Sequence, residues 1–204
     1  MQALQHSLIL MAQRPTLLRR LISPAVSRGH AFARDERGVT AIEFGILALP
    51  FFTIIYAILE TTMVFLAGQV LDGAVEDASR QIKTGQAQTF DIGDFRGLLC
   101  GYTFRLFGPD CSGVSIRVDV IDDFTSADTG TVPTTTCEVD EDGKTVCRLD
   151  VDEVYVPGAR RQVVQVTAYY RWPLLINLPY FNLSNQPDST RLLAATRVFR
   201  NEPF

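Results

Sequence analysis

The sequence predicts an α+β protein in which a long N-terminal helix packs on a small antiparallel sheet. Between Val39 and Leu71 the chain has no Lys, Arg or Asp. The apolar residues then continue at helical spacing as far as Ile82. Beyond Asp91, short alternating runs separated by Gly and Pro replace the helical pattern, which is typical of strands.

The first half of this helix is predicted to span a membrane, over residues 39–68. Phe44–Gly68 would measure about 37 Å as an α-helix, which is enough to cross a hydrocarbon core of about 30 Å. Residues 1–38 hold six arginines against two acidic residues, so this basic leader is expected to stay in the cytoplasm. No A-x-A-like site follows the apolar run, which argues against a secretory signal peptide.

The second half of the helix, residues 69–90, is predicted to be amphipathic. Apolar residues from Ala67 to Ile82 recur at helical spacing and charged residues take the other face. Thr84-Gly85 is a stop signal for a helix. Residues 91–204 are expected to form a β-rich domain that covers the apolar face, with strands near residues 114–120, 145–151, 161–172 and 189–200.

All four cysteines lie in this C-terminal part. An even number of cysteines beyond a membrane span is typical of disulfides in an oxidising compartment. Of the three possible connectivities, we favour Cys100–Cys111 together with Cys137–Cys147. The second pair brackets an Asp-Gly turn at 142–143, which would bring two strands together. The region has no C-x-x-C spacing and no His, so zinc is disfavoured.

Glu43 stands at the start of the apolar run, where an unpaired carboxylate in lipid is unfavourable. If the chain were cut after Gly38, the α-amino group of Val39 would become the new N-terminus, one helical turn from Glu43. In a low-dielectric setting the ammonium and the carboxylate satisfy one another. The partner amine would belong to the same chain or to a neighbour in an assembly.

These features follow the type IV prepilin pattern, which has a basic leader, a glycine before the cut, a glutamate at the fifth mature position and a long apolar run. More specifically, residues 37–83 resemble the TadE-like segment (TadE/TadG family) of the tight adherence (Tad) pilus system. The resemblance rests on Gly38, Glu43-Phe44, Pro50, Glu60 and the continuation rich in small residues. The Cys100 and Cys111 pair and the closing ATRVFRNEPF resemble TadE- and TadG-type proteins more loosely.

The resemblance implies a type IV pilin-like fold and a minor pseudopilin that is needed to assemble Tad/Flp-type (type IVb) pili. A prepilin peptidase would cut between Gly38 and Val39, and Glu43 with Phe44 would take part in assembly. The implied partners are this peptidase, other pilins and pseudopilins, Tad inner-membrane assembly proteins and membrane lipid. The implied location is the bacterial inner membrane, with residues 91–204 in the periplasm, or the pilus itself.

Two alternatives stay open at this point. One is an uncleaved single-pass inner-membrane assembly factor, and the other is a periplasmic ligand-binding module on an anchor, which would need an apolar pocket. Pro50 removes a helical hydrogen bond and predicts a kink. Glu60 lies about 26 Å beyond Glu43 along a helix, so we interpret it as a carboxylate of the opposite membrane interface, with intersubunit pairing as the alternative.

Nothing in the sequence indicates an enzyme. Both histidines, His6 and His30, lie in the leader, and no nucleophile, phosphate-binding or metal motif is present, so we expect no cofactor and no metal. The net charge is −4 and the C-terminal part is acidic, which argues against nucleic acid. We predict that the aromatic residues at 169–172 and Phe181 pack in the core.

Overall fold

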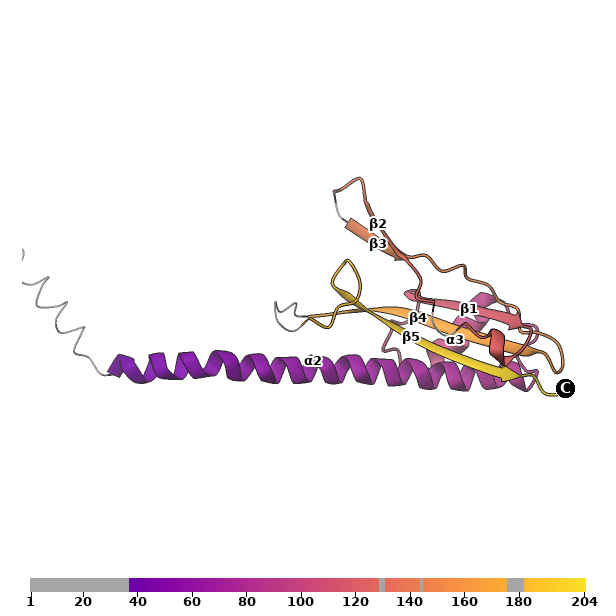
Figure 1. Cartoon of the computed structure of the whole chain (residues 1–204), viewed down its shortest axis with the longest axis horizontal. Coiled ribbons are helices and arrows are strands. Elements are labelled where there is room, and N and C mark those ends of the chain that lie inside the picture. Colours follow the sequence, from indigo (N-terminus) through magenta and orange to yellow (C-terminus); the bar gives the residue numbers. More distant parts are fainter. Residues whose placement is uncertain (1–36, 129–130, 144, 176–181) are drawn as a thin grey trace, which may run out of the picture. The chain divides into compact units, whose positions relative to one another are not determined.

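The computed structural model describes residues 37–128, 131–143, 145–175 and 182–204 (Figure 1). The chain divides into two compact units, residues 1–54 and 55–204. Helix α2 (Arg37–Lys83) runs through both, and small antiparallel sheets follow it. The predicted α+β class is confirmed.

The described part of the first unit is the beginning of α2, and it is apolar on all sides. Phe44, Leu47, Leu49 and Phe51 each expose more than half of their side chains. The apolar stretch of α2 has a mean hydropathy of 2.1 and none of it is buried within the protein. A helix of this length and composition is compatible with a membrane span. Pro50 lies within the helix, and the predicted kink there stays a prediction.

In the second unit, the other half of α2 packs one face against the sheet. From Ala67 onward the buried positions follow the predicted helical period, although Val70 is only partly buried. Val64 is buried as well, one turn before the predicted face begins. The buried positions are Val64, Ala67, Leu71, Ala74, Val75, Ala78 and Ile82. They share one hydrophobic core with the strands.

The main sheet has three antiparallel strands in the order β1–β4–β5: β1 (Val114–Ile121), β4 (Val163–Pro173) and β5 (Thr190–Arg200). In the register, Val118 lies opposite Val166 and Thr167 lies opposite Thr196. Because side chains alternate along a strand, Val166 faces the helix and Gln165 faces outward. The Gln165 amide accepts from the Asp128 backbone N–H at 3.0 Å and donates to the Asp128 carbonyl at 2.6 Å, so β4 is covered on its outer face as well.

Helix α3 (Ile92–Tyr102) is an element that the prediction missed, because it named strands and no helix within the β-rich part beyond Asp91. Asp91 is the N-cap, and its side chain accepts from the N–H of Asp94 at 2.8 Å while the Asp94 side chain reaches back to the N–H of Asp91. This reciprocal capping box starts the helix. Phe95 and Leu99, four residues apart, then bury on the same face.

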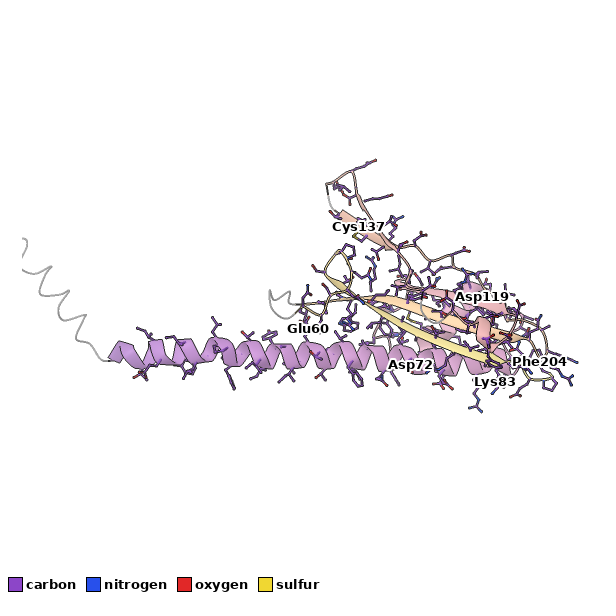
Figure 2. The ribbon with its side chains drawn as sticks, viewed as in Figure 1. Glu60, Asp72, Lys83, Asp119, Cys137 and Phe204 are labelled. Atoms are coloured by element: carbon purple, nitrogen blue, oxygen red, sulfur yellow. A yellow bond between two sulfur atoms is a disulfide. The ribbon has the colours of Figure 1, made fainter. Side chains whose placement is uncertain are left out.

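The C-terminal end of α2 also differs from the prediction. The helix ends at Lys83, and residues 84–89 form turns, so the predicted helical range 69–90 is too long. The stop signal itself was correct: Gly85 has φ +80°, which a side chain rarely tolerates. The last residues of the chain close this end (Figure 2), since Glu202 N–H donates to the Lys83 carbonyl at 2.9 Å and the Phe204 ring packs on Gly85.

The remaining strands, β2 (Thr135–Val139) and β3 (Thr145–Leu149), pair as a two-stranded antiparallel hairpin. Gly143 lies at its turn with φ +76°, in the predicted Asp-Gly position. Most of the hairpin side chains are exposed. Such a small hairpin is marginally stable by itself, so the disulfide across it helps to hold its two strands together.

Candidate functional site: the apolar helix and its junction with the folded domain

Glu43 lies on the exposed, apolar part of α2, followed directly by the exposed Phe44. Glu43 forms no hydrogen bond or ion pair with any residue that the structure describes. Gly38 and Val39 belong to the first turn of α2, and the leader before Arg37 lies outside the described residues. Cleavage after Gly38 and the pairing of Glu43 with the Val39 amine therefore stay predictions.

Glu60, in the second unit, has a partner that neither interpretation of the sequence included. Its carboxylate oxygen Oε1 accepts the backbone N–H of Leu175 at 2.5 Å, across 115 residues of sequence. Leu175 lies two residues after Pro173, the last residue of β4. Glu60 thus joins the helix to the end of the central strand of the sheet (Figure 2).

The folded domain begins to cover α2 about one turn after Glu60. Val64 is 9% exposed and Ala67 is fully buried. On the other side of the same turns, Met63, Phe65 and Leu66 stay exposed. These turns of the helix therefore have one face in the protein core and one apolar face without protein cover.

A second junction between the helix and the sheet is an ion-pair network centred on Arg197. Arg197 lies on the helix-facing side of β5, and its Nη1 and Nη2 donate to the two carboxylate oxygens of Asp72 at 2.8 and 2.6 Å. Its Nε donates to Glu76, one turn further along α2. These hydrogen bonds, chiefly the two with Asp72, raise the pKa of the Arg197 guanidinium. An edge strand that points a charge inward is also protected against pairing with other strands.

Sequence reasoning missed this network because it placed Asp72 and Glu76 on the helix face opposite the apolar residues and assigned them no partner. One signal was available in the run AATRVF. An arginine at an inward position of an alternating strand needs an acidic partner on whatever the strand covers. Asp72 and Glu76 are four residues apart and so lie on one face of the helix, where a single guanidinium reaches both.

The structure contains two disulfides, and they join the two pairs favoured from the sequence. Cys100 and Cys111 have an S–S distance of 2.09 Å and fasten the C-terminal part of α3 to the loop before β1. Cys137 and Cys147 have an S–S distance of 2.07 Å and lie directly opposite each other in the β2–β3 hairpin. Both bonds lie within the unit formed by residues 55–204.

Of the aromatic residues near the end of β4, Tyr170 and Trp172 pack against the core. The prediction was wrong for Tyr169, because alternation along the strand turns this side chain to the outer face of the sheet. The rings of Tyr170 and Trp172 both contact Phe107, with centroids at 4.6 and 6.3 Å. Phe181, which the prediction grouped with them, lies outside the described residues. Tyr155 packs beside Phe95 and donates its hydroxyl to the Ala87 carbonyl at 2.7 Å. Burial, with a smaller effect of Asp94, raises the pKa of the Tyr155 hydroxyl to about 12.

The folded unit carries open surface hollows whose linings mix polar and apolar residues. One of about 410 Å³ lies on the outer face of the sheet and is lined by Arg117, Asp119 and Tyr169 among others. This lining does not provide the apolar pocket that the ligand-binding alternative expects. Among residues 37–128, 131–143, 145–175 and 182–204, no group of three His, Cys, Asp or Glu side chains is placed to hold a metal ion.

Residues 38–80 match the family model described as TadE-like protein. The match begins at Gly38, at the predicted cleavage site, ends at Arg80 and lies entirely in α2. It confirms the resemblance to TadE-like proteins of the Tad pilus system, and it points to a part in Tad pilus assembly. A search of curated proteins and a search of solved structures each found no match to the chain.

Proposed function

We propose that this protein is a structural minor pseudopilin needed to assemble Tad/Flp-type (type IVb) pili, with a type IV pilin-like fold. One observation carries the proposal: the TadE-like match at 38–80 coincides with a helix whose first half exposes apolar side chains in every direction. Such a helix needs lipid or other apolar helices around it. A subunit that is first held in the membrane and then joins a bundle of similar helices has lipid around this helix at first and apolar helices around it afterwards.

The proposed topology places the leader in the cytoplasm and the folded domain in the periplasm. The arginine excess before α2 supports this orientation. Two disulfides in the folded domain support it as well, because such bonds form and persist in oxidising compartments. In this topology a prepilin peptidase at the cytoplasmic face cuts between Gly38 and Val39.

Glu43 then acts as the assembly carboxylate. A carboxylate within a membrane helix costs about 2.5–3.5 kcal/mol on insertion scales, and the Val39 ammonium of the same subunit or of a neighbour offsets this cost. Phe44 and the exposed residues that follow it pack against adjacent helices. Arg197 holds the sheet to α2 through Asp72, so that the domain travels with the helix when the subunit leaves the bilayer.

The proposal assigns no catalytic step, cofactor or metal to the chain, and its partners are the peptidase, other pilins and pseudopilins and the Tad inner-membrane assembly proteins. The match at 38–80 supports the uncleaved assembly factor equally, because it does not depend on loss of the leader. The two candidates differ in whether Glu43 has an α-amino group to pair with. This difference decides the experiment.

The test is a complementation assay in the bacterium from which the protein comes. We expect loss of the gene to abolish Flp-type pili, and we expect Glu43→Ala to be processed normally yet fail to restore them. Glu43→Asp is the matched control, because it keeps the negative charge and is expected to restore pili in part. Normal piliation by Glu43→Ala would contradict the pairing mechanism, and normal piliation without the gene would contradict the pilus function.

A further inference from the structure

The end of β4 carries an exposed apolar side chain at the level of Glu60. Leu175 is 86% exposed, although its neighbour Leu174 packs against the core. Its backbone N–H is bound by the Glu60 carboxylate, which fixes this strand end to one turn of α2. The helix turns around Glu60 carry exposed apolar side chains of their own. Together with Leu175 these residues, which lie around the helix near the level of Glu60, are termed the apolar patch: Leu59, Met63, Phe65, Leu66 and Leu175.

Helix length places this patch at the outer membrane boundary. Residues 40–59 measure about 30 Å as an α-helix, which matches the thickness of a hydrocarbon core. Glu60, the next residue, is charged, and Val64 and Ala67 beyond it are already buried by the sheet. A bilayer therefore cannot surround the helix as far as Gly68, where composition alone had put the end of the span.

The hydrogen bond to Glu60 has a physical purpose at such a boundary. Moving a backbone N–H group from water into lipid costs several kcal/mol if the group finds no hydrogen-bond acceptor there. A strand end therefore cannot enter the interface with its N–H groups unpaired. The Glu60 carboxylate supplies the acceptor for the Leu175 N–H. The Leu175 side chain, which extends away from the core, is then free to gain from burial in lipid.

We propose that the outer boundary of the membrane span lies at Glu60 and that the apolar patch rests in the outer-leaflet interface, so that the folded domain itself contacts the bilayer. The occupant of the patch is lipid, because the patch continues the exposed apolar surface of residues 42–58, the segment proposed to span the bilayer. The inference rests on the proposed function because it takes residues 42–58 to span a bilayer. It adds a lipid-binding surface on the domain, with Glu60 as its positioning residue.

The test measures the depth of single tryptophans in full-length protein reconstituted into phosphatidylcholine vesicles with brominated acyl chains. Trp172 is the only tryptophan and is first replaced by Phe, which keeps an aromatic ring in the core. Tryptophan is then placed at Leu175, at Phe51 as a membrane control, or at Phe124 as an aqueous control. Phe124 follows the end of β1 that pairs with Val163, at the opposite end of the sheet from Leu175.

We expect bromines near the headgroup to quench the Leu175→Trp fluorescence more than bromines in mid-chain. Phe51→Trp should be quenched best by the deep bromines, and Phe124→Trp should keep its fluorescence in both kinds of vesicle. Adding Glu60→Ala should remove the quenching at 175, whereas Glu60→Gln, which keeps a carbonyl acceptor, should preserve most of it.

Each contrary outcome has a separate meaning. If Leu175→Trp is not quenched while Phe51→Trp is, the lipid contact is refuted and the proposed function stands. If Phe51→Trp is not quenched either, the membrane span and the proposed function fail together. A blue-shifted Leu175→Trp emission without quenching would mean that a second copy covers the patch, which also overturns the inference. Quenching that survives Glu60→Ala would refute the role of Glu60 as positioning residue.

Discussion

The contact between Arg197 and α2 leads to a quantitative prediction about how the sheet is held to the helix. Arg197→Met keeps the apolar stem of the side chain and removes the guanidinium fork. In the folded protein this fork makes two hydrogen bonds to Asp72, at 2.8 and 2.6 Å, and one to Glu76. The Arg197 and Asp72 side chains are 30% and 43% exposed, so solvent screens the charges in part.

The expected magnitude follows from that partial exposure. An exposed ion pair contributes about 0.2–1 kcal/mol, and a charge-assisted bidentate pair lies at the upper end or above it. We therefore expect Arg197→Met to lower the free energy of unfolding by about 1–2 kcal/mol. The coupling between Arg197 and Asp72 should be about 1 kcal/mol. The coupling to Glu76 should be smaller, because that side chain is more exposed.

The assay is a double-mutant cycle with Arg197→Met and Asp72→Asn in the full-length protein in detergent micelles. Urea unfolding is followed by the fluorescence of Trp172, which packs in the core of the same unit. A second cycle with Glu76→Gln gives the weaker coupling, and high salt should reduce both. A coupling of zero between Arg197 and Asp72, or an unchanged free energy of unfolding for Arg197→Met, would refute the reasoning.

Three further predictions concern other contacts of the folded unit. Gly85→Ala should lower the free energy of unfolding by about 1–2 kcal/mol, because φ is +80° and an added Cβ would lie 2.5 Å from the Phe204 ring; thermal unfolding checks this, and an unchanged Tm would contradict it. Replacing Cys137 and Cys147 by Ser should increase amide hydrogen exchange in the hairpin while the main sheet stays protected, since the bond is local; equal loss of protection in both would count against a local role. The pKa of the Tyr155 hydroxyl is raised from 10.0 to about 12 on folding, so its contribution to stability should be complete below pH 10 and be lost as the pH rises toward 12; unfolding measured over this range should depend less on pH in Tyr155→Phe, and identical pH profiles would refute the assignment.

Much of the fold could be predicted because its signals are local. The apolar period of α2 runs without interruption for many turns, and the Asp-Gly turn lies between two short strands that contain Cys137 and Cys147. Such patterns predict the helix and the hairpin without any knowledge of distant residues. The same is true of the stop at Gly85, which only a glycine readily satisfies.

Helix α3 was missed for a local reason as well. Its sequence contains three glycines, at positions 93, 97 and 101, and each lowers helix propensity by about 1 kcal/mol relative to alanine. The capping box of Asp91 and Asp94 and the burial of Phe95 and Leu99 outweigh that loss. The capping signal was readable in the sequence, but it does not show whether the buried face has something to pack on.

The contacts that position the candidate site were out of reach for a different reason. Glu60 and Leu175 are 115 residues apart, and Arg197 and Asp72 are 125 residues apart. No local pattern identifies such a partner, because the pairing depends on which face of the sheet meets which turn of the helix. The sequence drew attention to Glu60 by its position in the apolar run, but its partner Leu175 could be identified only from the fold.

The processing of the chain is the central claim, and it has a direct test. The measurement is the intact mass and N-terminal sequence of the full-length protein extracted from membranes, with and without a co-expressed prepilin peptidase. We predict a chain that begins at Val39 and is present only with the peptidase. Gly38→Ala should prevent the formation of this processed chain. A chain that still carries residues before Val39, in cells where the peptidase cuts a known prepilin, would contradict the pseudopilin and favour the uncleaved assembly factor.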